Sequence, residues 1–97
     1  MQNKDLILNL FGQVEQINTE QYQTAKGHRY DVVKIRININ GASLELTARE
    51  KVIKLTKGVV IGDWLNVTAQ VVCRYTSKYT FISLDIQNLV NTTQYAN

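Results

Sequence analysis

The sequence predicts an all-β protein, a five-stranded barrel with one short helix between the third and fourth strands. Two observations predict this fold class. β-Branched and aromatic residues dominate the segments that show a pattern, and along them apolar and polar side chains alternate with the two-residue period of a strand. The length of 97 residues suits one domain, which we assign to residues 1–90, with a polar C-terminal tail at residues 91–97.

The first two strands are predicted to form a hairpin. The first covers residues 6–17, and Gly12 inside it indicates a bulge or a sharp bend. Residues 18–27 are polar and predict an open hairpin loop. The second strand, residues 29–40, alternates most clearly, and its inward-facing row is expected to consist of Val33, Ile35, Ile37 and Ile39.

A turn, a third strand and a helix are predicted next. The Asn-Gly pair at residues 40–41 is a strong signal for a two-residue hairpin turn, and it leads into a third strand at residues 42–47. Apolar residues then recur at helical spacing over residues 48–57. We expect Thr47 to cap this helix and Glu50, three residues later, to complete a capping box.

The last two strands are predicted for residues 64–74 and 79–89. A Gly-Asp turn at residues 62–63 precedes the fourth strand, and residues 75–78 form a tight connection to the fifth. Cys73 falls on the inward row of the fourth strand, so we expect it to be a small buried hydrophobe.

The order of three strands, a helix and two strands is that of the OB fold, a five-stranded Greek-key barrel that binds oligonucleotides or oligosaccharides. Residues 57–67, which include the Gly-Asp turn, resemble the start of the fourth strand in OB-fold nucleic-acid-binding proteins, and residues 79–89 resemble their fifth strand. The chain is similar to small single-stranded-DNA-binding proteins of bacteria, phages and plasmids, and to the related primosomal replication protein.

This resemblance implies sequence-tolerant binding of single-stranded DNA in replication, recombination or the processing of phage or plasmid DNA. It also implies replication proteins as partners. The bacterial proteins recruit partners through a flexible acidic tail, whereas residues 91–97 contain no acid. The resemblance therefore does not extend to recruitment through such a tail.

The composition bears on partners and location. A formal net charge of +3 is compatible with a polyanionic partner without requiring one. A single cysteine excludes an intrachain disulfide, and with a single histidine it supplies too few ligands for a zinc site. No apolar run approaches the roughly 18 residues of a membrane span, and the start of the chain lacks a secretory-signal pattern. We therefore expect a cytoplasmic protein with no cofactor, no metal and no membrane partner.

No catalytic triad, P-loop or paired-carboxylate cluster stands out, so we expect a binding protein rather than an enzyme. Binding of single strands needs cations along the path of the backbone and flat rings on which bases stack. Strand alternation turns such side chains outward, and the hairpin loops add more. The candidate nucleic-acid-binding residues are Tyr22, Lys26, Arg29, Tyr30, Lys34, Arg36, Trp64, Arg74, Tyr75, Lys78, Tyr79 and Phe81. The hypothesis requires Lys34 and Arg36 to share one outer wall with the rings of the last hairpin.

Other interpretations of the same residues stay open. Lys34 and Arg36 also fit an ordinary solvated face, and Trp64 also fits a plug at the mouth of the barrel. The cations of the predicted helix, beginning with Arg49, are interpreted as solvated surface. Exposed aromatic and arginine side chains also fit a protein-interaction or dimerisation module, and single-stranded RNA is an alternative to DNA. Because one small domain covers few nucleotides, we expect a homo-oligomer, either a dimer or a tetramer.

Overall fold

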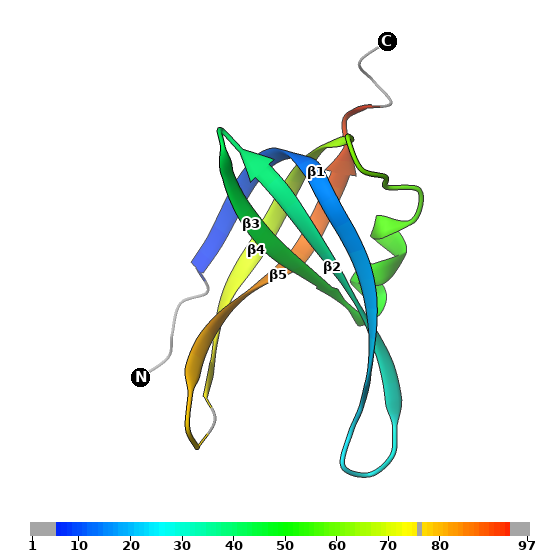
Figure 1. Ribbon diagram of the computed structural model, residues 1–97, viewed down its shortest axis with the longest axis vertical. Coiled ribbons are helices and arrows are strands. Elements are labelled where there is room, and N and C mark those ends of the chain that lie inside the picture. The colour runs from blue at the N-terminus through cyan, green and yellow to red at the C-terminus, as the bar shows by residue number, and fades with distance from the viewer. Residues whose placement is uncertain (1–5, 76, 94–97) are drawn as a thin grey trace.

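The structure is a computed structural model that describes residues 6–75 and 77–93, and only the backbone of Arg74. It confirms the predicted all-β class and the OB-type architecture. The elements are β1 (Leu6–Gln23), β2 (Arg29–Ile39), β3 (Ala42–Arg49), the 3₁₀ helix η1 (Glu50–Thr56), β4 (Trp64–Tyr75) and β5 (Thr80–Asn91). The strands close into a barrel in the order β1-β2-β3-β5-β4 (Figure 1). Within the described ranges, no helix has the length and apolarity needed to cross a bilayer.

β1 closes the barrel because it pairs with two different strands. Its first half, Leu6 to Gln13, is antiparallel to β4, and its second half, Gln13 to Gln23, is antiparallel to β2. The strand changes partner beside Gly12, where the predicted bend falls. The irregularity in the ladder with β2 comes just afterwards, between Val14 and Gln16.

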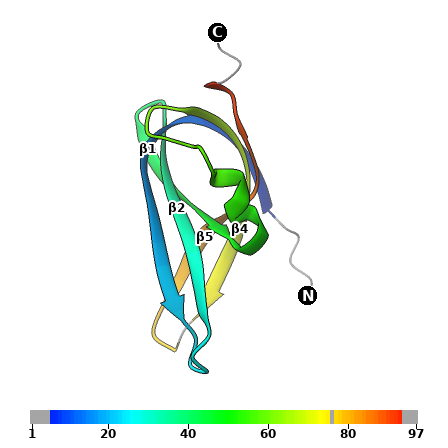
Figure 2. The same cartoon turned by 90° about the vertical axis from the view of Figure 1, so that its right-hand side faces the viewer.

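The inward rows of the strands fill the barrel. Val33, Ile35 and Ile37 are buried as predicted, and Ile39 is partly buried against them. The other strands and the loop before β4 complete the buried core with Val14, Leu46, Ala48, Val59, Leu65, Val67, Ala69, Ile86 and Leu89. η1 lies beside the barrel (Figure 2), and its residues Val52, Ile53 and Leu55 pack against this core.

The Asn-Gly turn is confirmed, whereas the open loop predicted for residues 18–27 is wrong. Asn40 and Gly41 both have positive φ angles, 50° and 91°, as a type I′ hairpin turn requires. Most of the predicted loop is strand, because β1 pairs with β2 as far as the pair Gln23 and Arg29. This hairpin projects beyond the barrel (Figure 1). Residues there are exposed on both sides, so no apolar alternation marks them as a strand.

The predicted capping box is also wrong. Thr47 lies inside β3, which continues to Arg49 because its last residues pair with β2. The helix begins only at Glu50, is of the 3₁₀ type, and has no side-chain hydrogen bond at its N-cap. Glu50 itself has a positive φ of 53°, so the chain turns sharply out of the strand at that residue.

Cys73 is exposed, which corrects the prediction that it is buried. Its cross-strand partner Ile82 is 65% exposed as well. Both residues lie near the end of the β4–β5 hairpin, which also extends past the barrel (Figure 1). The inward row of a strand is buried only where the barrel closes over it.

The end of β5 is tied to the start of β4. Thr92 donates its backbone N–H to the carbonyl of Trp64 at 2.8 Å, and Thr93 Oγ1 accepts the backbone N–H of Trp64 at 2.6 Å. The first residues of the predicted polar tail therefore bond to the barrel, and residues 94–97 lie outside the described part of the chain.

Candidate nucleic-acid interface

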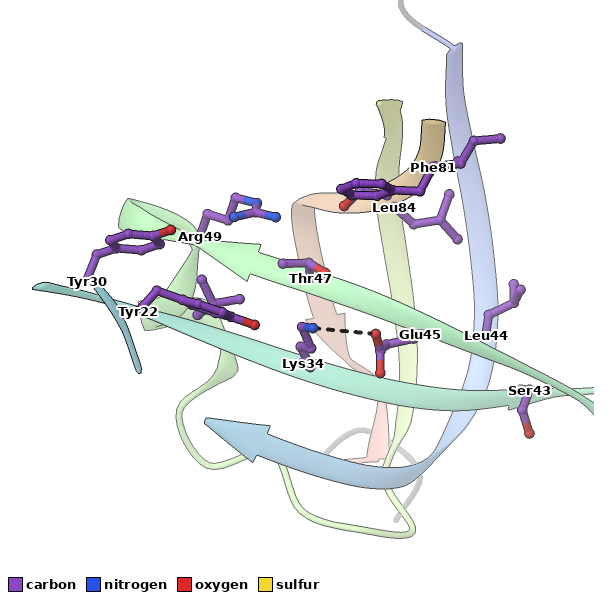
Figure 3. A pocket seen from close by; sticks show the side chains of 13 residues that line it. Tyr22, Tyr30, Lys34, Ser43, Leu44, Glu45, Thr47, Arg49, Phe81 and Leu84 are labelled. Atoms are coloured by element: carbon purple, nitrogen blue, oxygen red, sulfur yellow. Dashed lines mark ion pairs between the residues drawn. The ribbon is translucent and has the colours of Figure 1, made fainter. Parts of the chain in front are cut away.

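A groove of about 670 Å³ lies over the outer faces of β2 and β3, between the two projecting hairpins (Figure 3). This volume is within the range of ligand sites, roughly 300–1,000 Å³. The residues that line this hairpin groove are Tyr22, Tyr30, Val32, Lys34, Ser43, Leu44, Glu45, Thr47, Arg49, Phe81, Ile82, Ser83 and Leu84. They come from all of the strands except β4, and they include aromatic rings, two cations and hydroxyl groups.

Aromatic rings from both hairpins face the groove. Tyr22 and Tyr30 are directly opposite each other in the β1–β2 ladder, and their rings stack with centroids 5.6 Å apart and an interplanar angle of 25°. Phe81, from the β4–β5 hairpin, is 48% exposed. Figure 3 shows the tyrosine pair at one end of the groove and Phe81 at the other. The groove therefore offers flat apolar surfaces on both sides of a polar middle.

Lys34 lies in the middle of the groove between two carboxylates. Its Nζ is 3.3 Å from Oε1 of Glu20 on β1 and 3.9 Å from Oε1 of Glu45 on β3; Figure 3 draws the second of these ion pairs. The Tyr22 hydroxyl donates a hydrogen bond to Glu20. One ring of the groove is therefore connected to its lysine through a carboxylate.

The contacts of this cluster shift the pKa values of Glu20 and Lys34. The hydrogen bond from Tyr22, followed by the contact with Lys34, lowers the pKa of Glu20 below its ordinary value. Partial burial acts to lower the pKa of Lys34, but Tyr22 and Glu20 outweigh it, so the pKa of Lys34 is raised. Glu20 and Lys34 are therefore both ionised at neutral pH.

Arg49 is a groove residue that the sequence analysis interpreted as helix surface. It is the last residue of β3, pairs with Val32 of β2, and lies between the tyrosine pair and Phe81 in Figure 3. Its Nε is 3.5 Å from Oδ2 of Asp85, and this buried nitrogen forms no hydrogen bond. The outward alternation of Glu45 and Thr47 continues to Arg49, and this signal was hidden because the predicted helix began at residue 48, two residues before η1 begins.

The groove brings together four of the predicted site residues: Tyr22, Tyr30, Lys34 and Phe81. Lys34 and one ring of the last hairpin, Phe81, therefore share one outer face, as the hypothesis requires. Arg36 is exposed one alternation further along β2, opposite Glu45. The exposed residues of the two hairpin ends, outside the groove lining, are Lys26, Arg29, Tyr75, Lys78 and Tyr79. The side chain of Arg74 lies outside the described part of the structure.

Trp64 lies apart from the groove, on another face of the barrel. Its ring stacks on Phe11 with centroids 5.3 Å apart, and it is 42% exposed, so it does not plug the mouth of the barrel. The β1–β4 and β4–β5 registers place it on one outward face with other side chains that carry no charge. This uncharged face consists of Ile7, Asn9, Phe11, Trp64, Asn66, Thr68, Asn88 and Val90.

The fold and the groove together define a class, an OB-type barrel with rings and cations on the outer faces of β2 and β3. No protein-family model matches the sequence, and no curated protein matches it significantly. Among solved structures, the barrel is similar to the mitochondrial single-stranded DNA-binding protein of S. cerevisiae, with a TM-score of 0.66 and 17% identity over 93% of this chain and 98% of that chain. It is also similar to the small single-stranded DNA-binding protein of Streptomyces coelicolor, with a TM-score of 0.57 and 13% identity over 98% of this chain and 99% of that chain. At these identities the similarity establishes the fold.

Proposed function

We propose that this protein is a non-enzymatic, sequence-tolerant binder of single-stranded DNA, and that the hairpin groove is its binding site. The observation that carries the proposal is the arrangement of exposed rings from both hairpins around cations of β2 and β3 in one groove. The similar solved structures are those of single-stranded DNA-binding proteins, which supports the same proposal.

In the proposed complex, bases stack on the tyrosine pair and on Phe81 while Lys34 and Arg49 contact phosphates. Stacking contributes roughly 1–3 kcal/mol per base and tolerates any sequence, because every base has a flat π face. The remaining cations and rings of the hairpin ends extend the path of the strand beyond the groove. These residues are Lys26, Arg29, Arg36, Arg74, Tyr75, Lys78 and Tyr79.

The first prediction concerns the rings of the groove. Phe81→Ala and Tyr30→Ala should each weaken binding of a labelled oligo-dT by about 1–3 kcal/mol, the contribution of one stacked base. Fluorescence anisotropy measures the affinity, and Ile61→Ala is the matched control, because Ile61 is an exposed apolar residue outside the groove lining. Absence of oligo-dT binding by the native protein at low salt would refute the proposal. Clearly tighter binding of oligo-U would assign the groove to RNA.

We further propose that the protein is a homo-oligomer, a dimer or a tetramer, that associates through the uncharged face. Charged residues are depleted and aromatic residues enriched in the centres of protein interfaces, and this face has Phe11 and Trp64 among amides and apolar side chains. As a cellular role we propose handling of single strands in the cytoplasm, together with replication proteins, during replication, recombination or phage or plasmid DNA processing. This role is the one expected from the proposed similarity to bacterial, phage, plasmid and primosomal proteins.

A further inference from the structure

Lys34, the proposed phosphate contact, already forms ion pairs with two carboxylates of the protein. Glu20 lies 3.3 Å from its Nζ, closer than Glu45 at 3.9 Å. Glu20 also accepts the hydroxyl hydrogen bond of Tyr22, one of the two stacked rings. One carboxylate of β1 therefore holds both a ring and a cation of the groove.

This contact changes what Lys34 contributes to the binding of a polyanion. A phosphate that binds a free lysine releases one condensed counterion, and this release makes binding favourable and salt-dependent. A phosphate that binds Lys34 must first displace Glu20, and the freed carboxylate then attracts a cation from solution. The exchange therefore releases almost no counterion in total.

We infer that Glu20 sets the affinity and the salt dependence of the hairpin groove by holding Lys34 in place of a nucleic-acid phosphate. This inference rests on the proposed function. It makes Glu20 an affinity-determining residue that contacts no nucleotide, and it makes binding by the native protein depend mainly on stacking and on the other cations. The Glu20 contact with Tyr22 also keeps that ring beside Tyr30 before any base arrives.

The test is binding of oligo-dT by Glu20→Gln across a salt series, compared with the native protein. The amide keeps the size of the side chain and can still accept a hydrogen bond from Tyr22, but it removes the closer of the two negative charges beside Lys34 and leaves Glu45 at 3.9 Å. We expect the slope of log K against log salt to steepen by up to about 0.7, the value for one phosphate contact of an unpaired cation on a single strand. At low salt the affinity should rise by up to about five-fold, the upper end for an exposed ion pair.

Glu15→Gln is the matched control. Glu15 is another glutamate of β1, but it accepts hydrogen bonds from the neutral groups of Ser43 at 2.6 Å and Asn38 at 3.3 Å. Its replacement removes the same formal charge without releasing a lysine. A change of slope in this variant equal to that in Glu20→Gln would overturn the inference, because overall charge would then explain the effect.

A second measurement places Lys34 in the mechanism. Lys34→Gln should change the slope little in the native background but should return Glu20→Gln to the native slope, which is the coupling that a double-mutant cycle detects. If Lys34→Gln reduced the slope by the same amount in the native protein and in Glu20→Gln, Glu20 would not be limiting the contribution of Lys34. If neither the native protein nor Glu20→Gln binds oligo-dT, the proposed function fails. If the native protein binds and Glu20→Gln matches it in slope and affinity, only this inference fails.

Discussion

Gly12 lies where β1 changes partner from β4 to β2 and so closes the barrel. A Cβ at this position would lie 2.7 Å from the backbone carbonyl oxygen of Asn38 and 2.9 Å from Cγ1 of Ile39. Because the nearer atom belongs to the backbone of β2, it cannot move aside as a flexible side chain would. The lack of a side chain at Gly12 thus lets β1 approach β2 where it leaves β4.

Gly12→Ala should therefore destabilise the fold by about 1–3 kcal/mol, the usual cost of forcing an extra methyl group into a packed site. Urea unfolding followed by tryptophan fluorescence measures the change in the free energy of unfolding. An unfolding midpoint equal to that of the native protein would show that the two strands do not come this close.

The loop before β4 is bonded to two other elements, β1 and β5. Asp63 is 8% exposed, and its Oδ2 accepts the backbone N–H of Val60 at 2.9 Å and Nδ2 of Asn91 at 2.8 Å. The backbone of the Gly-Asp turn also exchanges two hydrogen bonds with Val14 of β1. One carboxylate and its turn thus fix the loop to β1 and to the end of β5.

Asp63→Ala should lower the free energy of unfolding by about 1–3 kcal/mol, because it leaves two partly buried donors, the backbone N–H of Val60 and Nδ2 of Asn91, without their acceptor. Thermal or urea unfolding measures the loss. Asp31→Ala is the control, since Asp31 is exposed and accepts a bond from Gln21 at 3.4 Å, so its effect should stay within about 0.5 kcal/mol. Equal effects of the two changes would contradict the role of the turn.

The stacked rings of the first hairpin depend on a whole element, the extended β1–β2 ladder. Tyr22 and Tyr30 stack because the strand ladder places them opposite each other, well past the residues where β1 pairs with β4. The length of the hairpin therefore decides that an aromatic pair lies beside the groove. The polar composition of residues 18–27 concealed this length.

The two surfaces for which functions are proposed lie on different faces of the whole molecule. The hairpin groove lies on β2 and β3 between the hairpins, and the uncharged face lies on β1, β4 and β5. Association through the uncharged face would leave the groove of each copy accessible. Several copies could then hold one strand, which raises the effective concentration of each site.

The corresponding prediction is that the native protein has a mass in solution that is a multiple of the 11.1 kDa chain. Phe11→Lys should reduce it to a single chain, because a lysine in the centre of an interface must be desolvated without a partner. Light scattering coupled to size-exclusion chromatography measures the mass. Ala25→Lys, in the exposed turn of the first hairpin, is the control that should leave assembly intact. A native protein that elutes as a single chain would contradict the proposal.

Local features of the sequence predicted much of this molecule. The row Val33, Ile35 and Ile37 is buried, the Asn-Gly turn has the expected backbone angles, and the helix falls between β3 and β4. Alternation and turn chemistry depend on neighbours within a few residues, so they can be recognised from the sequence alone. The outward direction of Lys34 follows from the same alternation.

The tertiary structure alone decided which of those outward side chains meet. It extended β1 to Gln23, exposed Cys73, placed Arg49 in the groove and separated Trp64 from it. It also brought Glu20 to Lys34 across the β1–β2 ladder. The physical reason is that these outcomes depend on the register and length of pairing between segments far apart in the chain, and the local pattern of each segment carries no record of its partner.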